Sequence, residues 1–447
     1  MNLLEEDVIQ KDNNENKKTK TIILIAIVLV ILIIIGIVCY LEYIKSSMLK
    51  LTLNGQSNEG LKSLLIFEED GSIYVPIKEV AKYFEYESYN GEYNSVSEEQ
   101  SKCYIQSENE IVNFSLGSNR IYKLELSKNA NGEYVNIEKP VKAINGVLCG
   151  TTEAIEKAFN VSFQYDEESN TIIIYTLPYL VELYKTKILD YGYSQLSQDF
   201  LNQKAIFQNI LIVKKDDGKN KYGVIDTAGN IILEPKYDEI KYQSKTGDFL
   251  VEANGKLGII SNSKQTKVQI IYSSIETLDS DSGLYVVKND KNKYGVIDAN
   301  GNIKIYIEND EIGMDISKFK ENNIKNRYIL MDNLIPVKKD KYWALYDKEG
   351  NRVTDYEYDS FGYIASNNKD ALNLLVIPKY NVLVACKDKK YTLVNSSGQK
   401  LFEPIADDIY MTINGQETHY YINVNNRQIN AEDYLDRKGV KTQNIDS

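Results

Sequence analysis

Histidine is almost absent from this chain of 447 residues, which contains one, His419, and only four cysteines. Catalysis centred on histidine and metal sites rich in histidine therefore have almost no side chains to draw on. A fold held together by many disulfides is excluded for the same reason. The sequence shows no glycine-rich phosphate loop, paired-carboxylate hydrolase signature or cluster of metal ligands. We therefore expect no catalytic, cofactor or metal site, and the ligand-binding residues are unknown.

Basic residues are outnumbered by acidic ones, with 52 Lys and Arg against 64 Asp and Glu, and the formal net charge is -12. Such a chain repels a phosphate backbone, so we expect no nucleic-acid partner. Its length suits two or three domains, and a hydrophobic content of 43% is enough for real cores. The 35 tyrosines are typical of many half-buried strands.

Residues 21–40 form an uninterrupted apolar run without a charged side chain. A helix of about 20 such residues can cross a bilayer, so the run predicts a transmembrane helix. Lys17, Lys18 and Lys20 precede it, which predicts that the N-terminus lies in the cytoplasm and the rest outside. A cleaved signal peptide is the alternative, but no small-x-small cleavage site follows. Cys39 is then an ordinary apolar residue of the helix.

Two phrases in the next segment combine a strand with a helix. Residues 73–84 read IYVPIKEVAKYF, and residues 150–176 read GTTEAIEKAFNVSFQYDEESNTIIIYT. Thr151 or Thr152 can cap the second helix, and a hairpin over 161–175 follows it. These phrases resemble the copper amine oxidase N-terminal domain, a stalk domain of bacterial surface proteins. The resemblance implies a compact α+β domain without copper chemistry, because that activity needs several histidines.

The C-terminal half repeats one phrase. KYGVIDTAGN at 221–230 returns as KYGVIDANGN at 293–302. Weaker copies begin at Tyr342, Lys390 and Lys256, and the copy at Lys256 lacks a recognisable closing turn. The repeat recurs every 35 to 49 residues, measured between the small residues Gly223, Gly258, Gly295, Ala344 and Thr392. Such periods with several strands per unit indicate a propeller-like ring or a β-solenoid, in which each unit covers the next.

Each copy predicts a strand, a tight turn and a second strand. Asp226, Asp298 and Asp347 occupy the first position of the turn and a glycine the fourth, as type I turns prefer. The small residue after the aromatic is expected to leave room for a neighbouring ring to lie on the backbone.

An aromatic, a small residue, two aliphatics, Asp and a downstream Gly resemble the WG repeat family. Tyrosine stands in the tryptophan position in the first and third copies, Leu257 in the second, and Trp343 is followed by Ala344. The resemblance implies an interaction or structural module without enzymatic activity.

Two kinds of side chain could still carry chemistry. Asp226, Asp298 and Asp347 could form a series of calcium sites, but their spacing lacks the density of a calcium loop, which favours turn capping. His419 could act as a lone base, but no nucleophile motif lies near it, which favours an ordinary strand residue.

The thiols and the rings each allow two interpretations. Cys103 and Cys149 could pair, which would leave Cys386 over, or all could be free buried thiols. Trp343 and the motif tyrosines could stack on sugar rings, but packing between repeats is favoured.

The expected organisation is a membrane-anchored multidomain protein. It comprises a cytoplasmic tail (1–20), one transmembrane helix (21–40), a small α+β stalk domain (49–176), a helical linker (177–210) and an all-β domain of five to six WG repeats (211–440).

The function expected from this organisation is a non-catalytic binding or scaffold protein of the cell envelope. It would cross the plasma membrane once, present its C-terminal region outside the cell, and bind a cell-wall polymer or an envelope protein without a cofactor. A wall-modifying hydrolase whose acidic residues are not adjacent in sequence, and an extracytoplasmic ligand sensor, are the alternatives. The sequence identifies neither the ligand nor the oligomeric state.

Overall fold

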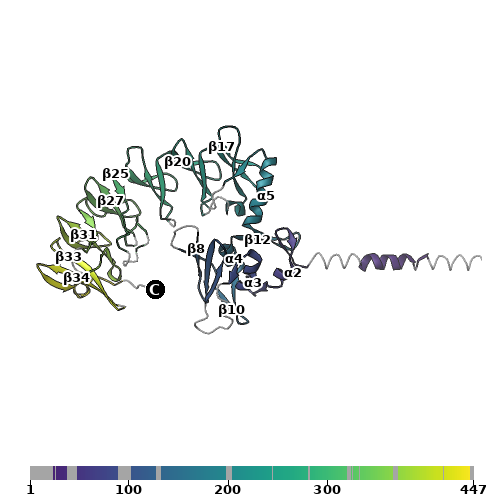
Figure 1. Ribbon diagram of the computed structural model, residues 1–447, viewed down its shortest axis with the longest axis horizontal. Helices are drawn as coiled ribbons and strands as arrows, with labels where there is room; N and C mark the ends of the chain where they lie inside the picture. Colours follow the sequence, from purple (N-terminus) through teal and green to yellow (C-terminus); the bar gives the residue numbers. More distant parts are fainter. Residues whose placement is uncertain are drawn as a thin grey trace, which may run out of the picture. The chain divides into compact units, whose positions relative to one another are not determined.

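The computed structural model describes residues 24–25, 27–37, 48–88, 102–126, 132–197, 204–243, 245–279, 282–319, 324, 326–331, 333–365, 371–415 and 417–442. Strands hold many more of these residues than helices do (Figure 1). Contacts divide the chain into two compact units. The first extends to Lys187 and includes Ile206–Gln208, and the second comprises Ile188–Ala205 and everything from Asn209 onwards.

The expectation of a transmembrane helix over 21–40 is wrong. Within that run the described helical residues are 24–25 and 27–37. In the part of the chain that the structure describes, no helix is both long and apolar enough to cross a membrane. The predicted tail over 1–20 and Cys39 lie outside the described residues.

The described part of the first unit contains three sheets. One has the order β12 (Val161–Asp166), β13 (Thr171–Thr176), β1 (Lys50–Leu53) and β2 (Gln56–Ser57), and β1 pairs with β13 in parallel. The second has the order β10 (Lys142–Ile144), β11 (Val147–Thr151), β4 (Ile73–Pro76) and β3 (Ile66–Phe67). The third is an antiparallel meander of β5 (Glu87–Ser88), β6 (Lys102–Gln106), β7 (Glu110–Ser115), β8 (Arg120–Glu125) and β9 (Glu133–Asn136).

Both predicted strand–helix phrases are present in the first unit. The strand β4 leads into α3 (Ile77–Ala81) and a 3-10 turn η1 (Lys82–Phe84), and β11 leads into α4 (Thr152–Phe159). Thr151 caps α4, because its hydroxyl oxygen accepts a hydrogen bond of 3.2 Å from the N–H of Ala154. A short helix α2 (Glu59–Lys62) completes the unit. The strands of the two phrases pair with each other, with Gly150 opposite Val75.

The segment over 177–210 is only partly helical. The helix α5 (Leu177–Asp190) and the 3-10 helix η3 (Lys204–Gln208) are present. Within this segment, which was expected to be helical, Gln195–Leu196 form the strand β14, because they pair with the first repeat strand, Leu196 opposite Val213.

The second unit is a succession of small antiparallel sheets in chain order (Figure 1). The first sheet contains β14, β15 (Ile210–Lys214), β16 (Tyr222–Asp226) and β17 (Ile231–Tyr237). The second contains β18 (Glu239–Gln243), β19 (Asp248–Ala253), β20 (Lys256–Ile260) and β21 (Thr266–Tyr272). The third contains β22 (Ser274–Asp279), β23 (Leu284–Lys288), β24 (Tyr294–Asp298) and β25 (Ile303–Asn309).

Three further sheets follow in the same unit. The fourth sheet contains β26 (Glu311–Ile312), β27 (Ile335–Lys339) and β28 (Tyr342–Tyr346). The fifth contains β29 (Ser360–Phe361), β30 (Val376–Ile377), β31 (Val382–Lys387) and β32 (Lys390–Asn395). The sixth contains β33 (Asp408–Asn414), β34 (Glu417–Val424) and β35 (Arg427–Asn430). The 3-10 helix η5 (Pro378–Tyr380) precedes β31, and the helix α7 (Ala431–Arg437) follows β35. The five copies of the repeated phrase form β16, β20, β24, β28 and β32.

The small residue of the repeat was expected to leave room for a neighbouring ring, and this expectation is wrong. The space beside it is occupied by the backbone of the outer strand of the same sheet. A Cβ on Gly295 would lie 2.6 Å from the carbonyl oxygen of Ile305 on β25, and one on Gly258 would lie 2.7 Å from that of Val268 on β21. At this point the register between the two strands shifts, because the outer strand bulges across the motif strand. Glycine is required because the bulging backbone occupies the space of a side chain.

The two copies without this glycine have a reduced outer strand. Beside Ala344 and Thr392 the fourth strand of the first three sheets is replaced by isolated bridges, such as Trp343 opposite Tyr358 and Tyr391 opposite Ala406. Thr392 is fully buried and its hydroxyl donates to the carbonyl of Phe402, at the position where glycine would leave room for the strand.

Candidate functional site

The closing turns of the repeats are stabilised by their first residue. One carboxylate oxygen of Asp226 accepts hydrogen bonds of 2.9 and 2.8 Å from the N–H groups of Ala228 and Asn230, and the other accepts one of 2.8 Å from the Asn230 side chain. This bond from the Asn230 side chain is the main cause that holds the pKa of Asp226 below its usual value. Asp298 makes the equivalent bonds at 2.9 Å. These carboxylates are therefore occupied by their own turns, as capping predicts.

The second copy also has a closing turn, so the expectation that it lacks one is wrong. Ser261 takes the place of aspartate, and its hydroxyl accepts a hydrogen bond of 3.0 Å from the N–H of Gln265. Lys264 takes the place of glycine and adopts the left-handed conformation with φ of 66°. Its ammonium group donates to the carbonyl of Ile231 in the preceding sheet at 3.0 Å.

The glycine of each later turn rests on the sheet before it. A Cβ on Gly301 would lie 2.7 Å from the carbonyl oxygen of Lys267, and one on Gly398 would lie 2.7 Å from that of Val353. Gly350 makes the equivalent approach to Lys304. All three glycines have a positive φ, so conformation and space both require glycine.

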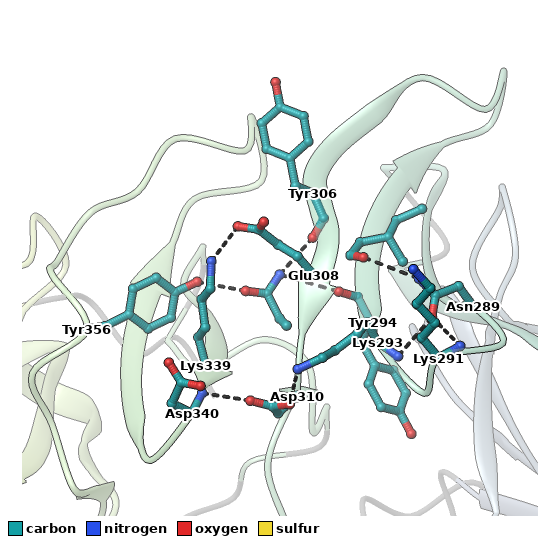
Figure 2. Close-up of polar contacts among 12 residues, drawn as sticks. Asn289, Lys291, Lys293, Tyr294, Tyr306, Glu308, Asp310, Lys339, Asp340 and Tyr356 are labelled. Carbon is teal, nitrogen blue, oxygen red and sulfur yellow. Dashed lines mark hydrogen bonds and ion pairs between the residues drawn. The ribbon is translucent and has the colours of Figure 1, made fainter.

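A second repeated contact joins consecutive sheets through a carboxylate in the connecting segment. Asp310 accepts hydrogen bonds from Lys293 at 2.5 Å, in the sheet before it, and from the N–H of Asp340 at 2.6 Å, in the sheet after it (Figure 2). Asp407 binds Lys390 at 2.5 Å and the N–H of Asn425 at 2.7 Å. Asp238 makes the same pair of contacts, with Lys221 and Asn254.

The junction between the third and fourth sheets also contains a buried amide. Asn309 is 2% exposed, and its amide nitrogen donates to the carbonyl oxygens of Tyr306 at 2.8 Å and Tyr294 at 3.3 Å. Its amide oxygen accepts a hydrogen bond of 2.8 Å from the hydroxyl of Tyr356. The amide nitrogen of Asn309 therefore bonds within the third sheet, to β24 and β25, and its amide oxygen joins that sheet to the next repeat, so the buried amide is satisfied.

We expect Asp238, Asp310 and Asp407, called the junction carboxylates below, to make the stability of the second unit sensitive to acid. The lysine hydrogen bonds are the main cause that lowers the pKa of Asp238, Asp310 and Asp407. A carboxyl group whose pKa is lower in the folded state than in the unfolded state stabilises the fold. This contribution is complete at pH values above the ordinary pKa, and it is lost as the pH falls through the folded-state pKa. The melting temperature of the triple Asp→Asn variant should therefore lie below that of the wild type at pH 6, and the difference should shrink below about pH 4.

Asp216→Asn is the control for this comparison, because Asp216 is exposed in the loop between β15 and β16. A difference between the wild type and the triple variant that stays constant from neutral to acid pH would contradict the proposed role of the three junction carboxylates.

The other predicted candidates lie in the framework of the second unit. Trp343 is 9% exposed and packs against Phe361, with ring centroids 6.2 Å apart, and the ammonium of Lys338 lies 5.5 Å above its ring. His419 is a residue of β34 opposite Thr412, and its Nε2 lies 3.7 Å from a carboxylate oxygen of Glu417. The tryptophan is therefore unavailable for stacking on a sugar.

The three described cysteines, Cys103, Cys149 and Cys386, are free and buried, so the disulfide considered between the first two is not formed. Burial raises the pKa of Cys103 and that of Cys149 to about 11. Within the described ranges no group of three His, Cys, Asp or Glu side chains is placed to hold a metal ion.

A buried ionic network in the first unit was not apparent from the sequence. Glu110 is 5% exposed and accepts hydrogen bonds from Tyr86 at 2.8 Å and from the Asn160 amide at 3.1 Å. The ammonium of Lys123, which is 8% exposed, lies 3.7 Å from Glu110 and donates to the carbonyl of Lys157 at the end of α4 at 3.0 Å. Burial, and then the charge of Glu110, raise the pKa of Tyr86. Only the pairing of β7 with β8 brings the two charges together.

The outer strands β17, β21 and β25 share one burial pattern but differ in chemistry. Their third and seventh residues are buried and their first, fourth and sixth are exposed. The fourth position holds Glu234, Gln269 or Tyr306, and the sixth holds Lys236, Ile271 or Glu308. Tyr306 is 74% exposed and Ile271 58%. The framework is thus constant, whereas the exposed positions vary between repeats.

Two protein families match this chain, in agreement with the resemblances drawn from the sequence. Residues 53–174 match the copper amine oxidase N-terminal domain. Residues 222–255, which begin with β16 and end after β19, match the WG containing repeat. No curated protein matches the chain.

Several solved structures are similar to part of the chain at low identity. A computationally designed protein, Ika8, is 11% identical over 73% of this chain and 91% of its own, with a TM-score of 0.23. The WD40 β-propeller domain of Doa1 is 7% identical over 72% of this chain and 88% of its own, with a TM-score of 0.18. A eukaryotic initiation factor is 12% identical over 74% of this chain and 89% of its own, with a TM-score of 0.27. Scores this low support no comparison of sites.

Proposed function

We propose that this chain, which carries a copper amine oxidase N-terminal domain and WG repeats, is a non-catalytic binding or scaffold protein of the cell envelope. One observation carries the proposal. The residues that recur between repeats are engaged in turns, bulges and sheet junctions, whereas exposed positions of equivalent geometry differ from sheet to sheet. A rigid framework with a variable surface suits recognition of a partner better than chemistry on a substrate.

The aspartates of the repeats support this proposal. A general acid or base needs a carboxyl group free to reach a substrate. Asp226 and Asp298 are held by backbone N–H groups of their own turns, and Asp310 is held between two sheets. The location outside the cytoplasm stays a prediction from the sequence. Protection of the repeats from a protease added to intact, wall-stripped cells would contradict it.

We expect the purified full-length chain to sediment with isolated cell-envelope material. The control is an unrelated protein of similar size and net charge, which separates specific binding from the effect of an acidic surface. The same incubation also tests the enzymatic alternative, because soluble wall fragments released by the chain would indicate hydrolysis. Failure of the folded chain to sediment with any envelope fraction, or release of such fragments, would contradict the proposed function.

A further inference from the structure

A cleft of about 710 Å³ lies at the C-terminal end of the second unit. The closing turn of the fifth copy contributes Asn395, Ser396 and Gln399 to its lining. The segment that follows α7 contributes Lys438 and Lys441. This volume falls within the range of roughly 300–1,000 Å³ that is typical of small-molecule sites.

The cleft is positively charged, although the chain as a whole is acidic. Its lining includes Lys400, Lys438 and Lys441 but no aspartate or glutamate. The charge of Lys400 is neutralised by Glu357, which is not a lining residue; the ammonium nitrogen lies 2.9 Å from a carboxylate oxygen of Glu357. Lys438 lies 5.8 Å from the centroid of the Tyr434 ring, and within the described part of the chain no carboxylate pairs with Lys438 or Lys441. Two ammonium groups are thus available to an anion.

The fifth copy of the repeat departs from the others at this cleft. Asn395 stands where other copies have Asp226, Asp298 and Asp347. Its amide oxygen still accepts hydrogen bonds from the N–H groups of Ser397 and Gln399, at 3.1 and 2.9 Å, so the turn is kept. The exchange of a carboxylate for an amide therefore removes a negative charge from the cleft without loss of the turn.

We propose that this cleft binds a phosphate-bearing sugar or polyol. Lysine ammonium groups bind phosphate as point charges. The hydroxyl and amide groups of Ser396, Gln399 and Asn381 suit the hydroxyls of a sugar or polyol. This inference names the ligand class of the binding function proposed above and rests on it. Such a unit could come from a free metabolite or from a phosphate-containing polymer of the envelope.

Calorimetric titration of the full-length chain with glycerol 3-phosphate tests the inference. We expect saturable binding to glycerol 3-phosphate, none to glycerol, and a lower affinity as the salt concentration rises. The double variant Lys438→Gln, Lys441→Gln should bind at least about tenfold more weakly, which corresponds to roughly 1.4 kcal/mol. Lys215→Gln with Lys219→Gln is the matched control, because both lysines are exposed in the loop between β15 and β16.

Poly(glycerol phosphate) in a second titration distinguishes the two sources. Affinity per phosphate well above that of the monomer supports an envelope polymer, and equal affinity supports a small metabolite. No saturable binding of either compound, or equal binding by the wild type and the Lys438/Lys441 variant, would overturn the inference. If the double variant still sediments with envelope material as the wild type does, the binding function stands and only the cleft is excluded as its site.

Discussion

Substitution of Lys123 by methionine is expected to lower the free energy of unfolding of the first unit by about 3–5 kcal/mol, because removal of one partner leaves a buried charge unpaired. The charge left behind is that of Glu110, which is 5% exposed. The substitution also removes the hydrogen bond of 3.0 Å to the carbonyl of Lys157, which caps the end of α4. Hydrogen exchange at Val112 and Phe114 in β7 would report this loss separately from the second unit.

A double variant tests whether the unpaired charge is the cause. In Glu110→Gln, Lys123→Met the buried charge is absent, so the loss of stability should be smaller than the sum of the two single losses. Lys185→Met is the control, because the pair of Lys185 with Glu182 is exposed and contributes less than about 1 kcal/mol. A loss in Lys123→Met no greater than in this control would show that the network does not stabilise the fold.

Alanine in place of Gly301 is expected to cost the second unit roughly 2–5 kcal/mol, from the left-handed conformation and from crowding at the sheet junction. Gly301 has a φ of 81°, and the added Cβ would lie 2.7 Å from the carbonyl oxygen of Lys267. The third sheet would have to move away from the second to relieve this contact, because a backbone atom cannot rotate aside.

Gly218→Ala separates the two causes. Gly218 has a φ of 79°, nearly that of Gly301, but an added Cβ meets nothing within 4 Å. This control should therefore lose only the conformational part, roughly 1–2 kcal/mol. Denaturant unfolding of both variants measures the difference. Equal losses would show that the approach between the sheets contributes nothing to stability.

Local signals in the sequence were sufficient for many elements. The turn residues from Asp226 to Asn230, the N-terminal cap of α4 and the motif strands were predicted correctly, because each depends on residues within one short segment. The turn at Ser261 was missed because a serine hydroxyl and a left-handed lysine replace the usual aspartate and glycine.

Contacts between distant residues could not be predicted in this way. The bulge beside Gly295 involves residues ten positions further along the chain, and the pair of Glu110 with Lys123 depends on strand register. The cleft beside Lys438 requires the C-terminal segment to return to the turn at Asn395. The transmembrane helix was predicted from an apolar run, and no helix in the described part of the chain is long and apolar enough to cross a membrane.

In the second unit the closing turns contact the sheet that precedes them in the chain, so each turn depends on residues that are earlier in the sequence. Lys264, Gly301, Gly350 and Gly398 each lean on residues of the sheet before them. A ribosome releases the chain from its N-terminus, so each new sheet emerges when the surface that supports its turn has already been made. Assembly can therefore follow synthesis one sheet at a time, and truncation from the C-terminus leaves the support of the earlier turns in place.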